Sequence, residues 1–195
     1  MGRQPKMTFE MSESRIMKAS REQFSRFGYH AARIADIVSC SEINRRLVYE
    51  IVTDKESLYM AVLSEVSREF DMAVSSAFES QALTWTSAAQ VYDAAFELLR
   101  QFRDFSRLLA WEWLNETIQG ARILAVAANF REKIHAAARR VRPECASCLD
   151  TLDLALEAMI LRYAVADAPS AVDVEHLVQV ASDLFSSLEN ASFSS

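Results

Sequence analysis

The sequence predicts an all-α protein, and three observations carry that prediction. The 195 residues include only three glycines and three prolines, whereas a sheet protein needs turn residues at short intervals. About half of the residues (51%) are hydrophobic, so the chain can bury a substantial core. Along much of the chain, hydrophobic residues recur every three or four positions, which is the spacing of one face of a helix.

The first predicted helix begins after Ser12 or Ser14 and ends at Gly28. Glycine commonly follows the last turn of a helix because it adopts the left-handed cap conformation at little cost. The apolar face of this helix has residues at helical spacing. They are Ile16, Ala19, Phe24 and Phe27.

Two short helices follow, at about 33–39 and 45–51, joined by a tight connection. Asn44 is a suitable N-cap for the second of them, because its side chain can accept a backbone hydrogen bond. Glu42 stands in the turn, and if that position needs a positive φ, a glutamate costs about 1 kcal/mol there. Asp54 caps a fourth, longer helix. The apolar stripe of that helix is Leu58, Val62, Val66, Phe70, Ala73 and Ala77.

Five further helices are predicted, over 85–103, 104–118, 121–141, 144–166 and 171–190. The last two carry apolar seams with identical spacing, so they can pair with each other as a helical hairpin. Two such hairpins, one from each copy of the chain, can close into a four-helix bundle by twofold symmetry. We therefore expect a homodimer through the last two helices; the alternative is that both seams face the chain's own core. The seams are Leu149, Leu152, Leu156, Met159 and Tyr163, then Val174, Leu177, Ala181, Leu184 and Leu188.

Charge is spread unevenly along the chain, whose net charge is −6. Residues 1–56 carry ten Lys and Arg against eight Asp and Glu, while residues 57–195 carry eleven against nineteen. A mildly basic N-terminal part on an acidic body is typical of a protein that touches DNA at one end. An acidic body also keeps a protein soluble, so the pattern alone leaves both interpretations open.

The sequence offers no membrane or secretion signal. The longest apolar run, 123–128, is far shorter than the roughly 20 residues that a membrane span needs, and the N-terminus has no apolar signal segment. Three cysteines, an odd number, do not make a disulfide framework. We expect a reduced, cytoplasmic protein with no membrane partner.

Four segments stand in a defined order near the N-terminus: FSRFGY at 24–29, IADI at 34–37, INRRLVY at 43–49 and DKESL at 54–58. In residues and spacing they resemble the N-terminal domain of the TetR family of one-component transcriptional regulators. The resemblance covers about residues 14–63. The remainder shares the length and the all-helical character of that family's C-terminal domain.

The resemblance implies an N-terminal three-helix DNA-binding domain with a helix-turn-helix over residues 1–56, including an N-terminal tail. It implies a larger C-terminal helical domain for ligand binding and dimerisation over residues 57–195. The implied function is a homodimeric, sequence-specific DNA-binding transcriptional regulator, a repressor released by a small hydrophobic or aromatic ligand. Its implied partners are a palindromic operator DNA and a small-molecule effector.

Six positions are expected to contact DNA. Arg45 and Arg46 fall where the family reads base edges, and arginine suits guanine because its fork bonds O6 and N7 together. Tyr49 falls on the recognition-helix tyrosine that contacts a phosphate. Lys55 falls on a backbone-contacting lysine at a helix N-terminus, whose partial positive charge also attracts phosphate.

The remaining two expected DNA contacts are Asn44, on a capping or phosphate-contacting position, and Arg33, near a hydroxyl residue for which it can substitute a charged contact. Glu50 is unusual on a DNA-facing helix: it can accept from cytosine N4, or simply repel phosphate. Glu42 and Glu50 motivate an alternative function, a dimeric ligand-binding or scaffold protein with weakened or lost DNA binding.

The resemblance also implies a small-molecule pocket in the C-terminal helices, where residues 85–130 are rich in aromatic side chains. Trp111 and Trp113 point about 200° apart on a helix, so only one of them can line a given pocket. Glu112 and Glu116 share another face of this helix. If either faces inward beside aromatic rings, a lipophilic cation is favoured, and if both face water, a neutral or acidic ligand is equally open. Any single aromatic residue is more often plain core. The candidate ligand contacts are Tyr92, Phe96, Trp111, Asn115 and Phe130.

Cys145 and Cys148 form a C-x-x-C at a predicted helix start, where the helix dipole lowers a thiol pKa. A thiol-based redox regulator is therefore a further alternative, beside buried structural thiols. Cys40 lies in the turn between the second and third helices. No phosphate-binding glycine loop, nucleophile elbow or pair of metal ligands appears, so we expect no enzyme activity, no catalytic residues, no cofactor and no metal site.

Overall fold

A computed structural model of the chain describes residues 9–81, 84–115, 117–141, 153–158 and 160. Every regular element in this part of the chain is a helix, as the composition predicted. Residues 153–158 are helical as well. The labelled elements are α1 (Phe9–Ala31), α2 (Ile34–Ser41), α3 (Arg45–Ile51), α4 (Lys55–Gln81), α5 (Ala88–Gln101), α6 (Arg103–Asn115), the 3-10 turn η1 (Ile118–Gly120) and α7 (Ala121–Val141).

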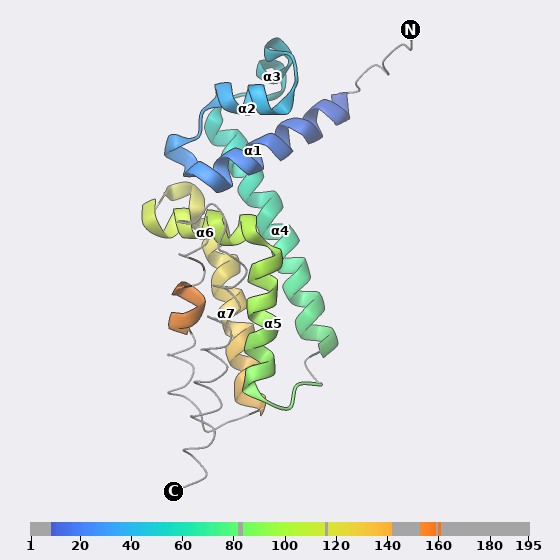
Figure 1. Cartoon of the computed structure of the whole chain (residues 1–195), viewed down its shortest axis with the longest axis vertical. Coiled ribbons are helices and arrows are strands. Elements are labelled where there is room, and N and C mark those ends of the chain that lie inside the picture. The colour runs from blue at the N-terminus through green and yellow to red at the C-terminus, as the bar shows by residue number, and fades with distance from the viewer. Residues whose placement is uncertain (1–8, 82–83, 116, 142–152, 159, 161–195) are drawn as a thin grey trace, which may run out of the picture.

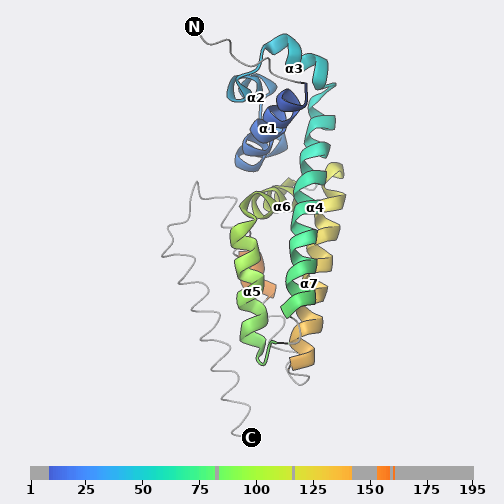
Figure 2. The same cartoon turned by 90° about the vertical axis from the view of Figure 1, so that its right-hand side faces the viewer.

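The helices form two groups that share α4 (Figure 1). We call α1, α2 and α3 the head, and α5, α6 and α7 the body. Figure 2 shows α4 running lengthwise from the head along α7 of the body. The head also touches the body directly, because α1 packs against α6. The two groups are therefore mechanically connected through α4 and through the α1–α6 contact.

The first helix is interrupted where the sequence predicted its end. Gly28 has φ 71° and ψ 178°, outside helical geometry, and a short turn then carries α1 on to Ala31. The start is earlier than predicted, because α1 already begins at Phe9. The helix buries Ile16, Ala19 and Phe24, whereas Phe27 is 39% exposed. Three of the four residues of the predicted apolar face thus reach the core.

The second and third helices follow the prediction closely. Glu42 ends α2 in the left-handed conformation (φ 56°, ψ 27°), so the turn does require a positive φ from a glutamate. Its carboxylate lies 3.8 Å from the guanidinium of Arg15. The side chain of Asn44 accepts the backbone N–H of Arg46 at 2.9 Å, which caps α3.

The long helix α4 begins with the predicted cap, since Asp54 accepts the backbone N–H of Ser57 at 2.6 Å. The predicted stripe is right as far as Phe70. Beyond that point α4 buries Val74 and Phe78 and leaves Ala73 and Ala77 half-buried. The reason is tertiary: the neighbours of α4 change from α1 to α5 and α7 along its length, and the buried face turns with them. The domain boundary predicted after residue 56 falls in the first turn of α4 and stays a prediction.

In the body, α7 has the predicted bounds, whereas α5 and α6 are shorter than predicted. A capping box starts α5, in which Ser87 and Gln90 satisfy each other's backbone N–H groups. Phe70 of α4 stacks on Phe105 of α6, with ring centroids 3.8 Å apart. Phe130 of α7 makes a T-shaped contact with Phe70, with ring centroids 5.0 Å apart. These rings tie α4, α6 and α7 into one core.

Most of the last two predicted helices lies outside the described residues, and so do Cys145 and Cys148. Of the seam residues predicted to form the dimer, only Leu156 is described, and it is buried in the chain's own hydrophobic core. The homodimer therefore remains a prediction. Within the described part, no helix has the length and hydropathy needed to cross a lipid bilayer.

Candidate nucleic-acid interface and ligand cavity

The short helix α3 is anchored by one face and presents the other to solvent. Val48 is fully buried and Val52, its C-cap, is 7% exposed. Arg46 and Glu50 point outward, and Tyr49 is 53% exposed although it is a large ring. A short capped helix held by a few apolar residues, with polar and aromatic groups on its outer face, matches the geometry of a recognition helix.

Arg46 is already engaged on this surface. Its Nε lies 3.1 Å from Oε1 of Glu50, one helical turn away, and the two side chains are 88% and 57% exposed. An exposed pair of this kind contributes at most about 0.5 kcal/mol. Arg46 can therefore leave Glu50 for another partner at little cost. Glu50 nevertheless places a negative charge beside the arginine.

The other expected DNA contacts lie nearby in the head. Asn44 is exposed and its side chain is used for the α3 cap, while Arg33 is an exposed N-cap of α2 with no side-chain cap bond. Lys55 reaches back to the end of α1, where its Nζ lies 3.3 Å from the carbonyl of His30 and 4.8 Å from the centroid of the Tyr29 ring. Partial burial lowers the pKa of Lys55. The side chain of Arg45 lies outside the described part.

The body contains a cavity of about 130 Å³. Its walls come from α5, α6 and α7, together with residues 153, 156, 157 and 160. Apolar side chains dominate these walls, with three charged groups among them. The cavity is lined by Leu99, Phe105, Leu109, Trp113, Leu124, Ala127, Ala128, Phe130, Arg131, Ile134, Asp153, Leu156, Glu157 and Ile160.

A larger open groove of about 600 Å³ runs in the head between α1 and the start of α4. Six apolar residues line it beside five charged ones, which are Glu10, Glu13, Lys18, Arg21 and Glu65. Such a charged, open surface does not suit a hydrophobic ligand. The cavity in the body is the better candidate for the expected pocket.

The structure does not bring the five expected ligand contacts together. Phe130 lines the cavity, whereas Tyr92 and Phe96 are buried in the core elsewhere. Asn115 is exposed and donates its Nδ2–H to the carbonyl of Trp111 at 2.8 Å. Trp111 itself faces the head, and ligand contact by these four residues remains only a prediction.

Of the two neighbouring tryptophans, Trp113 lines the cavity and Trp111 does not. This agrees with the expectation that one helix cannot direct both rings to one site. Phe105, Leu109 and Trp113 follow one another at intervals of four residues, so the sequence could have shown that they share one face of α6. The sequence alone did not say which of its two faces met the cavity.

The opposite side of α6 meets the head. The indole Nε1–H of Trp111 donates to the backbone carbonyl of Ser25 at 3.1 Å. The Trp111 ring also covers Gly28, where an added Cβ would lie 2.9 Å from Cδ2 of the indole. The end of α1 therefore packs directly on α6.

Glu112 does face inward, but toward the junction of α4 and α6 and not toward the cavity. It is 1% exposed, and its carboxylate accepts the hydroxyls of Tyr59 and Thr117. Burial raises the pKa of Tyr59, and the hydrogen bond to Glu112 raises it further. The Tyr59 ring packs against Phe24 and Tyr29 of α1, so the glutamate is linked through one side chain to the core of the head.

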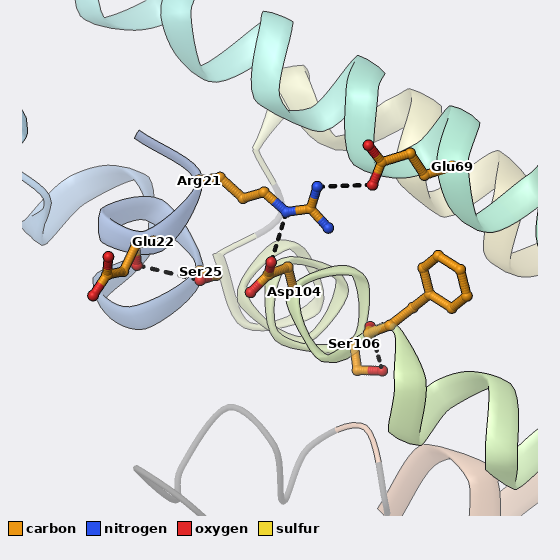
Figure 3. A network of polar contacts seen from close by, with 7 residues as sticks. Arg21, Glu22, Ser25, Glu69, Asp104 and Ser106 are labelled. Atoms are coloured by element: carbon orange, nitrogen blue, oxygen red, sulfur yellow. Dashed lines mark hydrogen bonds and ion pairs between the residues drawn. The ribbon is translucent and has the colours of Figure 1, made fainter. Parts of the chain in front are cut away.

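Arg21 of α1 joins three helices at once (Figure 3). Its Nη1 lies 2.7 Å from Glu69 of α4, and its Nε lies 2.6 Å from Asp104 of α6. Burial alone would lower the pKa of Arg21, but the hydrogen bonds to Glu69 and Asp104 raise it. The guanidinium of Arg21 thus holds α1 of the head against both α4 and α6.

Of the three cysteines, Cys40 lies in the part of the chain that the structure describes. Cys40 is exposed, with its Sγ 3.4 Å from Nε2 of Gln23. No group of three or more His, Cys, Asp or Glu side chains is placed there to hold a metal ion. Cys145 and Cys148 lie outside it, so the redox alternative is an untested prediction.

No family model matches the chain. Over 99 residues it is 26% identical to the HTH-type transcriptional regulator RutR of Escherichia coli (strain K12), an alignment that covers 51% of this chain and 46% of RutR. The chain therefore spans about half the length of the curated relatives that it matches. RutR is a transcriptional regulator of the helix-turn-helix type.

Solved structures match nearly the whole chain. A TetR-like transcriptional regulator from Rhodococcus sp. RHA1 is 17% identical with a TM-score of 0.61, over 93% of this chain and 96% of that one. The fatty acid degradation regulator FadR from Bacillus halodurans is 16% identical with a TM-score of 0.54, over 89% and 97%. At such identities the likeness shows the fold, which is the all-helical fold expected from the sequence.

Proposed function

We propose that this chain, which has the fold of the TetR-like transcriptional regulators, is a sequence-specific DNA-binding regulator that a small ligand releases from its operator. The observation that carries the proposal is the construction of α3. Asn44 caps it, Val48 fixes it to the head, and Arg46 and Tyr49 remain on its outer face.

In this proposal α3 enters the major groove of DNA. Arg45 and Arg46 read base edges there, while Tyr49, Lys55, Asn44 and Arg33 hold the backbone. A homodimer formed through the last two helices would present two copies of α3 to half-sites about 34–36 Å apart, which requires a palindromic operator.

Release follows from the two faces of α6. On one face Leu109 and Trp113 line the cavity, and on the other Asp104 and Trp111 bind α1 of the head. A ligand that moves the cavity face by a small amount moves the other face of the same rigid helix. The two recognition helices then lose the spacing that the operator requires, and the ligand favours the unbound state.

Selection of binding sites from a random pool of DNA duplexes tests the DNA-binding function. The purified protein should enrich a twofold-symmetric motif, and the double variant Arg45→Ala plus Arg46→Ala should not. The matched control is Arg100→Ala plus Arg122→Ala, which removes the same charge from exposed positions of the body and should keep the motif. Binding should also weaken steeply with salt, since phosphate contacts release counterions.

One observation favours a second function, a ligand-binding or scaffold protein without DNA binding. Glu50 lies on the outer face of α3 and pairs with Arg46, so it competes with phosphate for the arginine. If a folded, dimeric protein enriches no motif, with or without candidate ligands, this second function replaces the first.

A further inference from the structure

The size of the cavity limits what it can hold. Its volume is about 130 Å³, close to the roughly 150 Å³ of an engineered apolar cavity that holds one benzene molecule. Three aromatic residues, Phe105, Trp113 and Phe130, share its walls with leucines and isoleucines. A single aromatic ring fits this space and these walls. A long acyl chain or a fused polycyclic ligand is larger than this volume.

Among the described residues that line the cavity, the charged groups carry a net negative charge. Asp153 and Glu157 are four residues apart on one helical segment, so they share a face, and Arg131 comes from α7. Arg131 and Glu157 are exposed, whereas the Asp153 side chain is only 19% exposed. Of these three charged groups, Asp153 is therefore the one most shielded from water.

The carboxylate of Asp153 retains capacity for a ligand. Its Oδ1 lies 2.8 Å from Nε2 of His135, which is itself only 19% exposed. An ionised carboxylate accepts about four hydrogen bonds through its two oxygens. The negative charge of Asp153 also acts on Tyr92. Burial raises the pKa of Tyr92, the charge of Asp153 raises it further, and Arg139 lowers it.

We propose that the ligand of this cavity is a one-ring aromatic molecule, neutral or cationic, whose hydrogen-bond donor binds the carboxylate of Asp153. The identification of this molecule as the effector rests on the proposed function above. The ring lies among Phe105, Trp113 and Phe130, and the donor group points to Asp153. Aromatic carboxylates of the same size are rejected, because they bring a second negative charge to an acceptor.

Three probes of nearly equal size test separately the need for a hydrogen-bond donor and the exclusion of a negative charge. They are benzylamine, benzyl alcohol and benzoate. Isothermal titration calorimetry on the full chain should show binding of benzylamine and benzyl alcohol, with benzoate at least about tenfold weaker. Asp153→Asn should weaken benzylamine by about tenfold or more and benzyl alcohol by about threefold or less. Glu79→Gln, an exposed change at the far end of α4, should change nothing.

Two variants test the size of the site. Ala127→Phe fills the cavity and should abolish binding of all three probes; its thermal unfolding is measured alongside. Trp113→Ala enlarges the cavity, so 1-naphthylmethylamine, which the unaltered protein should reject, should now bind. This second variant keeps the test decisive if Ala127→Phe does not fold.

The inference is overturned if benzoate binds as tightly as benzylamine, if Asp153→Asn leaves the order of affinities unchanged, or if none of the probes binds. None of these titrations contains DNA. Binding of benzylamine without any enriched operator would overturn the proposed function and leave the ligand class standing. An enriched operator without binding of the probes would do the reverse.

Discussion

Trp111 and Ser25 are 86 residues apart in the sequence, and the indole Nε1–H of Trp111 donates to the backbone carbonyl of Ser25 at 3.1 Å. The bond joins α6 of the body to α1 of the head. Arg21 of the head makes a second polar link to α6, through Asp104, and Tyr59 of α4 donates to Glu112 of the same helix. The attachment of the head thus depends on a few identifiable side chains.

Trp111→Phe should lower the free energy of unfolding by about 1 kcal/mol, since it removes one partly buried hydrogen bond and keeps an aromatic ring over Gly28. Urea unfolding followed by circular dichroism measures the loss. Trp113→Phe is the matched control for truncation of an indole on the same helix. An unchanged midpoint for Trp111→Phe would mean that the bond to Ser25 contributes nothing to stability.

Gly28→Ala should cost about 2–3 kcal/mol of unfolding free energy, because two unfavourable effects coincide. The backbone at Gly28 has φ 71° and ψ 178°, a region that only glycine adopts readily. A Cβ there would also press on the Trp111 ring at 2.9 Å. In a double-mutant cycle, Gly28→Ala should cost less in the Trp111→Ala background, because the steric clash is gone there and only the backbone strain remains. Additive effects of the two changes would argue against the contact.

Glu112→Ala should destabilise the protein by about 3 kcal/mol, because it leaves the buried hydroxyl of Tyr59 without its acceptor. Tyr59→Phe should cost about 2 kcal/mol, since it removes a donor from a buried carboxylate. The double variant should cost clearly less than the sum of the two, as expected for partners in one hydrogen bond. Chemical denaturation of the three variants gives these values, and strict additivity would contradict the pairing.

Asp54→Ala should lower the melting temperature at neutral pH by removing the cap of α4. The hydrogen bond from the backbone of Ser57, and then that from its hydroxyl, lower the pKa of Asp54 below its ordinary value of 3.8. A lowered folded pKa means stability that is present above pH 3.8 and is lost as the pH falls through the folded value. The difference in melting temperature from the unaltered protein should therefore shrink below that pH. Glu79→Ala should show no such difference at any pH.

Glu50→Gln should strengthen DNA binding by about three- to tenfold at low salt, because it frees Arg46 and removes a negative charge from the surface that meets phosphate. Fluorescence anisotropy with the selected operator measures the change. Glu97→Gln, which breaks the comparable exposed pair with Arg100 on α5, should leave affinity unaltered. Weaker binding by Glu50→Gln would instead assign Glu50 a favourable contact, such as one with cytosine N4.

Features that depend on neighbours in the sequence were predictable from the sequence by itself. The break at Gly28, the cap at Asn44, the cap at Asp54 and the bounds of α3 and α7 all follow from backbone hydrogen bonds within one or two turns. The outward position of Arg46 and Tyr49 on α3 was expected from the family resemblance and not from these local signals.

The tertiary structure alone decided which partner each helical face meets. Periodicity showed that Trp111 and Trp113 point in different directions, but the packing of α6 between the head and the cavity determined that Trp113 lines the cavity. It likewise buried Glu112 against Tyr59, 53 residues away, and brought Arg21 to Glu69 and Asp104. A sequence pattern fixes the angle between two side chains on one helix. The neighbour that each one reaches depends on how distant segments share a single core, and no local signal carries that information.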